Sequence, residues 1–156
     1  MRKLLVLASV FFALSVNGQE VEKRVDEFTN KVSYSVNATC NFEKEGDAEM
    51  ALMPTFTDRG ELEWIGSLAV GIGCLDNATI YILFEDGETI IKTMFNRFNC
   101  DGLSAFKLSK KDWEKLATKQ IAKVKLQNKG KSIIGVPENP NYFIRVSEIV
   151  AEKDYL

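Results

Sequence analysis

Two apolar runs joined through an Asp-Gly pair constrain the fold of this chain more than any other stretch of its sequence. Residues 80–84 are rich in β-branched and aromatic side chains, and so are residues 89–95, which follow the acidic segment 85–88. Asp86 and Gly87 suit the centre of a type I′ turn, because both central positions need a positive φ, which glycine tolerates freely and aspartate better than most residues. The sequence therefore predicts an antiparallel β-hairpin that turns at Asp86-Gly87.

The three carboxylates of the acidic segment allow two further interpretations. A calcium-binding loop of the EF-hand type would need oxygen ligands at alternating positions through about twelve residues, but Ile90 and Ile91 occupy that stretch here. A catalytic use would need a second carboxylate facing the first across a cleft. We interpret the segment as a structural turn, with a surface calcium site and catalysis as the weaker alternatives.

The register of this hairpin bears on the three cysteines, Cys40, Cys74 and Cys100. With Asp86-Gly87 at the centre of the turn, strict pairing along the two strands brings Cys74 near Cys100, but their positions are offset by one residue. A single β-bulge corrects the mismatch, and residues 95–98 break the alternation where such a bulge fits. Directly opposed residues lie within disulfide reach. We therefore expect a Cys74–Cys100 disulfide, with pairings that involve Cys40 as the alternative.

The N-terminus has the composition of a secretory signal peptide. Two basic residues precede an apolar run over residues 4–16, and residues 16–18 are small enough for a signal peptidase. The run is shorter than the roughly 20 residues that span a bilayer. We expect residues 1–18 to be cleaved and residues 19–156 to form a single α+β domain, exported to the periplasm or the cell exterior. Within it, residues 19–30 should fray or form a short helix, and no integral membrane segment follows.

Composition excludes several classes of chemistry. The chain has no histidine, so Ser-His-Asp and Cys-His nucleophiles and histidine-containing zinc sites are excluded. The cysteines lack a Cys-x-x-Cys spacing, which argues against a structural zinc site. A net charge of −2 without a basic block argues against a nucleic-acid partner. We expect no metal and no cofactor, and a protein or small-molecule ligand of unknown identity as partner.

Hydrophobic periodicity predicts the remaining elements. Alternation favours strands over residues 31–36, 49–56, 103–108 and 121–127, with Pro54 confining the second to a sheet edge or a strand end. Residues 62–70 are apolar but ambiguous between strand and buried loop.

Two helices are predicted beside these strands. Ser109 and Asp112 are typical of the N-terminus of a short helix, and a second helix should start after Asn139-Pro140. The predicted fold class is α+β: a mostly antiparallel sheet, curved or sandwich-like, with one short helix between strands and one at the C-terminus.

Several short motifs carry little functional weight. The sequons at Asn37 and Asn77 matter only in a host that glycosylates them. Ser104 and Lys107 match the Ser-x-x-Lys of serine acyltransferases, but that motif works when both residues share a helix face, and here they lie on an expected strand. Trp64 and Trp113 fit either a pocket or the core.

Residues 73–132 carry a resemblance to a group of proteins. Their features are a strand ending in Phe84-Glu85-Asp86-Gly87, an Asn99-Cys100 pair a dozen residues on, and then a phenylalanine-containing strand and a helix. A further strand with Ile121 and Val124 follows. This stretch resembles a segment of uncharacterised small exported proteins of Bacteroidetes. The resemblance implies a bacterial exported protein and transfers no activity.

Two functional hypotheses follow from the sequence. The first is a non-enzymatic exported binding or interaction module, because no convergent polar constellation is visible and both faces of the 80–95 hairpin are apolar enough to need cover. The alternative is a small carboxylate-dependent hydrolase acting in the periplasm or outside the cell, which needs two acids across a cleft. Its candidates are Asp76, Asp101 and Glu61, which the sequence cannot pair.

Overall fold

Two antiparallel β-sheets and two helices form the part of the chain that the computed structural model describes, which comprises residues 21–25, 32–36, 40–42, 49–57 and 62–152. The large sheet has the order β1-β2-β4-β5-β8, with β3 also paired to β4. Its strands are β1 (Val21–Val25), β2 (Val32–Val36), β3 (Cys40–Asn41), β4 (Glu49–Thr57), β5 (Leu62–Val70) and β8 (Leu103–Lys107). The predicted α+β class, mostly antiparallel, is confirmed.

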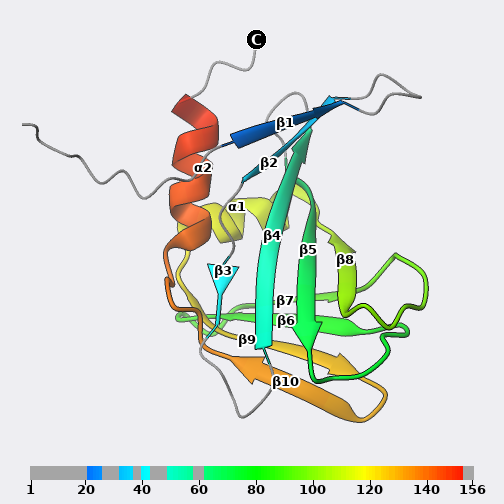
Figure 1. Cartoon of the computed structure of the whole chain (residues 1–156). Coiled ribbons are helices and arrows are strands. Elements are labelled where there is room, and N and C mark those ends of the chain that lie inside the picture. The colour runs from blue at the N-terminus through cyan, green and yellow to red at the C-terminus, as the bar shows by residue number, and fades with distance from the viewer. Residues whose placement is uncertain (1–20, 26–31, 37–39, 43–48, 58–61, 153–156) are drawn as a thin grey trace, which may run out of the picture.

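The small sheet has the order β10-β9-β6-β7. Its strands are β6 (Thr79–Phe84), β7 (Thr89–Thr93), β9 (Ile121–Asn128) and β10 (Lys131–Gly135). Figure 1 shows β4 and β5 running across the direction of β6, β9 and β10, so the two sheets cross where they meet. This is an orthogonal packing of two sheets rather than a closed barrel.

The core lies between the sheets and is supplied by alternate residues of each strand. Such alternation places every second side chain on one face of a sheet. The inward residues of β4, β5 and β8 include Phe56, Ile65 and Phe106, and those of the small sheet meet them from the other side. The largest side chains with less than 2% exposure are Phe56, Phe84, Phe106, Phe143, Leu52, Ile65, Leu75, Ile80, Ile82, Ile90, Leu116 and Leu126.

The 80–95 hairpin forms, but its turn differs from the prediction. Phe84 N–H donates to the Glu88 carbonyl over 2.9 Å, and Gly87 N–H donates to the Phe84 carbonyl over 3.0 Å. The loop therefore has three residues, and of these only Gly87 has a positive φ, at 87°. The prediction of a type I′ turn at Asp86-Gly87 is wrong: this is a three-residue loop with glycine at the left-handed position. Asp86 instead uses its carboxylate, which accepts from Glu88 N–H over 3.0 Å.

A two-residue turn with positive φ at both positions occurs between β9 and β10 instead. Lys129 has a φ of 44° and Gly130 one of 83°, and Asn128 pairs with Lys131. The buried Asn128 side chain donates to the Cys74 carbonyl over 2.8 Å and accepts from Asp76 N–H over 3.0 Å. Asn128 thus attaches the loop between β5 and β6 to the end of the small sheet.

The Cys74–Cys100 disulfide is confirmed, with a Cα–Cα distance of 3.9 Å. Hairpin register persists to Ala78, which accepts a hydrogen bond from Met94, but the next bridge joins Leu75 to Asn99. The chain segment 94–99 is therefore two residues longer than the segment 75–78 opposite it. The two extra residues lie in the 95–98 stretch, where the sequence predicted a bulge of one residue. Two occur because the hairpin loop is one residue longer than predicted, which shifts the register of the paired strands by one.

Two expectations about the large sheet need correction. The segment 19–30 was expected to fray or form a short helix, but Val21–Val25 is strand β1, because antiparallel pairing with β2 supplies its backbone partners. Pro54 was expected at a sheet edge or strand end, but β4 lies inside the sheet. Among the described strands Pro54 pairs only with Ile65, and the pairings of β2 and β3 to β4 stop on either side of it, so proline is tolerated there.

The helices cover the sides of the two-sheet stack. Helix α1 (Lys110–Thr118) begins at the Ser109 cap, where Ser109 and Asp112 exchange hydrogen bonds in a capping box, as the sequence predicts. Its Leu116 is fully buried, and its Trp113 packs edge-on against Phe56 of β4 with ring centroids 5.4 Å apart.

Helix α2 (Tyr142–Glu152) follows Asn139-Pro140, as predicted. Its start is held by Asn139, whose side chain accepts from Asn141 N–H over 3.0 Å. The buried face comprises Tyr142, Phe143, Val146 and Val150. Phe143 is 1% exposed and is one of the largest fully buried side chains among the described residues.

The loop geometry predicts the effect of a β-carbon at Gly87. No atom lies within 4 Å of a β-carbon built there, so Gly87→Ala adds backbone strain without a clash. The free energy of unfolding should fall by about 1 kcal/mol. Gly87→Asn should lose less, because asparagine tolerates the left-handed region better. Urea unfolding of both variants checks this, and equal losses would contradict the assigned φ.

Candidate functional site

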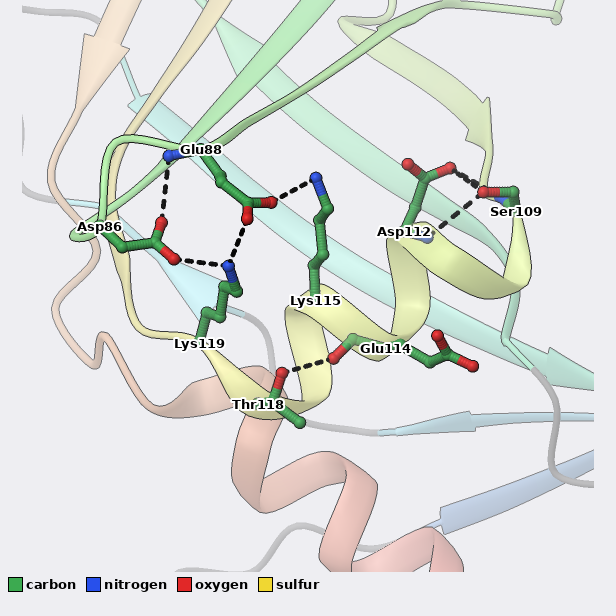
Figure 2. A network of polar contacts seen from close by, with 8 residues as sticks. All are labelled: Asp86, Glu88, Ser109, Asp112, Glu114, Lys115, Thr118 and Lys119. Carbon is green, nitrogen blue, oxygen red and sulfur yellow. Dashed lines mark hydrogen bonds and ion pairs between the residues drawn. The ribbon is translucent and has the colours of Figure 1, made fainter.

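The acidic segment 85–88 binds helix α1. Lys119 Nζ lies 2.5 Å from Asp86 Oδ2 and 2.8 Å from Glu88 Oε1, and Lys115 Nζ lies 2.5 Å from Glu88 Oε2. Figure 2 shows these side chains meeting between the hairpin loop and the last turn of α1. A further ion pair, Lys92 to Asp112 over 2.6 Å, joins β7 to the first turn of the same helix.

These contacts determine the protonation of the carboxyl groups. Hydrogen bonds from Lys119 and from Glu88 N–H lower the pKa of Asp86, and those from Lys115 and Lys119 lower the pKa of Glu88. Burial opposes ionisation of Asp112, but its bonds to Lys92 and Ser109 outweigh this and lower its pKa. Carboxylates held in the ionised form by lysines are unsuited to act as general acids. Their role here is to attach α1 to the hairpin.

The structure locates two of the three other acids named from the sequence. Asp76 pairs with Lys129 over 2.7 Å, and Asp101 lines a separate hollow beside the disulfide. Glu61 lies outside the described residues, as do Asn37 and the expected signal segment 1–18.

The Ser-x-x-Lys motif and the second sequon can both be located. Ser104 is buried and Lys107 exposed, because they point to opposite faces of β8, so the motif does not assemble. Asn77 is exposed in the loop before β6, with a φ of 53°.

Cys40 is a buried free thiol on β3. Burial, with a smaller contribution from the charge of Glu138, raises the pKa of Cys40 to about 12. A thiol with such a pKa carries almost no thiolate at neutral pH and is a poor nucleophile. Cys40 therefore belongs to the core rather than to a reactive site.

The outer face of β4, β5 and β8 is the most unusual surface among the described residues. Inward positions of β5 such as Ile65 are buried, so the alternate positions Leu68 and Val70 point outward and are exposed. Leu68 pairs with Leu103, an exposed residue of β8. We call this the apolar face; its residues are Ala51, Met53, Trp64, Gly66, Leu68, Val70, Leu103 and Ala105.

Aromatic residues extend the apolar face beyond β8. Phe95 N–H donates to the Ala105 carbonyl over 2.9 Å, and Lys107 Nζ lies 5.6 Å from the centre of the Phe95 ring. Phe98, in the same loop, is 62% exposed. The side chain of Asn96 donates to the Leu103 carbonyl and accepts from Ala105 N–H, so it occupies backbone groups at the edge of β8.

A pocket of about 430 Å³ lies at one end of the apolar face. It shares Ala51, Leu68 and Val70 with that face, and Phe42 and Met50 contribute further apolar lining. Its polar lining consists of Asn41 and two exposed carboxylates, Glu49 and Glu138. The apolar face and this pocket form the candidate binding site.

Sequence reasoning missed this surface. It identified the 80–95 hairpin as apolar on both faces, but the outward Tyr81 and Leu83 of β6 lie beside Lys125 and Lys123 of β9. Lys125 Nζ sits 4.1 Å from the centre of the Tyr81 ring. The available signal was the largely apolar character of residues 64–70, in which the alternate positions Trp64, Leu68 and Val70 are apolar although Ile65 and Ala69 between them already supply the core.

The described residues contain no helix long and apolar enough to cross a membrane. Nor do they contain a group of three or more cysteine, aspartate or glutamate side chains placed to hold a metal ion. No protein-family model, curated protein or solved structure matches this chain. The candidate site therefore rests on the geometry above.

The ion pairs of the acidic segment predict a pH dependence of stability. Because the folded-state pKa of Asp86 is lowered below its ordinary 3.8, its pairing stabilises the fold above that value. The stabilisation is lost as the pH falls through the lowered pKa.

Asp86→Asn should therefore lower the thermal midpoint at neutral pH and match the parent protein at strongly acid pH. Asparagine keeps an oxygen for Glu88 N–H, so the substitution removes the Lys119 pair selectively. Thermal unfolding followed by circular dichroism across pH measures the effect. Glu85→Gln in the same loop is the control, and an equal loss there would contradict the assignment.

Proposed function

We propose that this protein is an exported, non-enzymatic binding module whose apolar face binds an extended apolar segment of a partner protein. The observation that carries the proposal is the run of uncharged outward residues on three adjacent strands, between Glu49 at one end and Lys107 at the other, with Leu68, Val70 and Leu103 exposed to water. When one face of an antiparallel sheet is exposed to water, the residues on that face are ordinarily polar. Contiguous exposed apolar surface on a soluble domain is typical of an interaction site.

The pocket suggests the chemistry of the partner. Its apolar lining offers a place for one large aliphatic or aromatic side chain, an anchor of the kind that dominates protein interfaces. Glu138 lies beside this place, so a basic residue next to the anchor would complement its charge. A segment with an aromatic or aliphatic anchor next to lysine or arginine fits the site best.

Export is part of the same proposal. The Cys74–Cys100 disulfide supports it, because disulfides persist mainly in oxidising compartments. The signal-like residues 1–18 and the resemblance of residues 73–132 to small exported proteins of Bacteroidetes support a bacterial periplasmic or extracellular location.

The binding proposal is tested with peptides of defined sequence. A phage-displayed random peptide library selected on the oxidised protein should yield peptides with an apolar anchor beside a basic residue. Leu68→Glu should weaken the best peptide at least about tenfold in fluorescence polarisation, because it places a charge at the centre of the apolar face.

Leu83→Glu is a matched control, since Leu83 is 37% exposed and Leu68 is 38% exposed, but Leu83 lies on the outer face of the small sheet. It should leave the affinity unchanged. Peptides that bind Leu68→Glu as tightly as the parent protein would refute the proposed site.

A carboxylate-dependent hydrolase is the second candidate, and one observation favours it: Glu49 and Glu138 line the same pocket. The sequence candidates Asp76 and Asp101 do not line it. Both pocket carboxylates are exposed, whereas the general acid of a glycosidase is one that its surroundings keep protonated. This arrangement supports the hydrolase less well than the binding module.

Turnover of a panel of aryl glycosides separates the two functions. A hydrolase predicts release of the aryl group that either Glu49→Gln or Glu138→Gln abolishes. The binding module predicts no release by the parent protein, and only weaker peptide binding by the two variants. Turnover that both substitutions remove would overturn the non-enzymatic proposal.

A further inference from the structure

The segment between β7 and β8 exposes two phenylalanines to water. Phe95 is 52% exposed and Phe98 is 62% exposed, and the exposed Arg97 lies between them in the sequence. Figure 1 shows the connection from β7 to β8 projecting from the side of the two-sheet stack. Large apolar side chains gathered on one exposed feature are typical of an interaction site, because a partner can bury them. We call residues 95–98 the aromatic loop.

Hydrogen bonds and the disulfide fix the conformation of the aromatic loop. The side chain of Asn96 donates to one backbone group of β8 and accepts from another, and the side chain of Asn99 donates to the Arg97 carbonyl over 3.2 Å. The disulfide closes the segment one residue further on. A segment that is ordered before it binds loses little conformational entropy on binding. The loop is therefore suited to present Phe98 and Arg97 to another molecule.

The aromatic loop carries the kind of side chains that the pocket of the candidate site accepts. The pocket has an apolar lining that includes Phe42 and Leu68, with the exposed Glu138 beside it. Phe98 is an exposed aromatic anchor, and its neighbour Arg97 is a base. Within the described part of the chain, neither Arg97 nor Glu138 has an ion-pair partner. Their opposite charges are therefore available to each other across an interface.

The pocket and the aromatic loop lie on opposite sides of β5, near the same end of that strand. Ala51 of β4, which lines the pocket, pairs with Leu68 of β5. Leu68 pairs in turn with Leu103 of β8, whose carbonyl accepts from the Asn96 side chain. A two-fold axis along β5, in the plane of the apolar face, therefore sets the loop of each copy against the pocket of the other. Such an interface is isologous, so both contacts form at once.

We propose that the segment bound by the candidate site is the aromatic loop of a second copy of this chain, with Phe98 in the pocket and Arg97 beside Glu138. The inference rests on the proposed function, because it uses the same site and names the occupant. The reciprocal contact covers the exposed Leu68 and Val70 of both copies. It thus gives the apolar face a partner whose charge and shape the chain itself supplies.

Sedimentation velocity of the oxidised protein from about 1 µM to about 500 µM tests the contact, because the dimer fraction grows with protein concentration. Phe98→Ser should raise the dimer dissociation constant about tenfold or more, since each dimer contains this anchor twice. Ile91→Ser is the matched control: Ile91 is 58% exposed but pairs with Tyr81 on the outer face of the small sheet, and its loss should leave the dimer unchanged. Circular dichroism verifies that each variant is folded.

Charge reversal tests the pairing of Arg97 with Glu138. Arg97→Glu and Glu138→Arg each set like charges together at both contacts, so each should raise the dissociation constant about tenfold. An equimolar mixture of the two variants should recover the dimer, because the reversed loop then meets the reversed pocket and the unchanged loop meets the unchanged pocket. Glu148→Arg makes the same charge change at an exposed position of α2, and mixing it with Arg97→Glu should recover nothing.

The outcomes separate this inference from the proposed function. A parent protein that stays monomeric throughout the concentration range, a Phe98→Ser variant that dimerises like the parent, or a charge-reversed mixture that fails to recover the dimer would each overturn the second copy as occupant. If the selected peptides nevertheless bind the parent protein and lose affinity in Leu68→Glu, the proposed site stands and a different protein occupies it.

Discussion

The burial of the two sheets against each other is the constraint on which the rest of the structure depends. Inward residues such as Phe56 and Ile65 of the large sheet meet Ile82 and Phe84 of the small one, and this burial is the main favourable term of folding. Because side chains alternate along a strand, burying one set fixes the other set outward. The exposure of Leu68 on the apolar face is thus a direct consequence of burying Ile65 and its inward neighbours.

Polar contacts hold the ends of this stack in place. The acidic hairpin loop is attached to α1 through Lys115 and Lys119, and Asn128 and the Cys74–Cys100 bridge hold the loop before β6. The ion pairs are exposed, so each of them contributes modestly. These polar contacts leave the apolar face of the large sheet uncovered, and this is the face proposed to bind an extended segment of a partner.

Local signals in the sequence predicted much of the fold, because the forces involved act over a few residues. The Ser109 cap and the 80–95 hairpin are examples. The turn type was missed because Asp86 satisfies a neighbouring N–H, a choice that composition does not reveal. The position of Pro54 was predicted wrongly because an interior strand can be unpaired on one side over a short stretch, where two partner strands end. The candidate binding site was missed because its residues come from β4, β5 and β8, which meet only in the folded chain.

The sequence by itself determined which segments form strands and which form helices, since periodicity, capping and turn chemistry are properties of neighbouring residues. It also excluded histidine chemistry outright. Tertiary structure alone decided which apolar residues face water. Leu68 and Ile65 are equally hydrophobic in a sequence pattern, and only the position of the second sheet makes one core and the other surface. Burial is a relation between segments distant along the chain, so no local pattern can assign it.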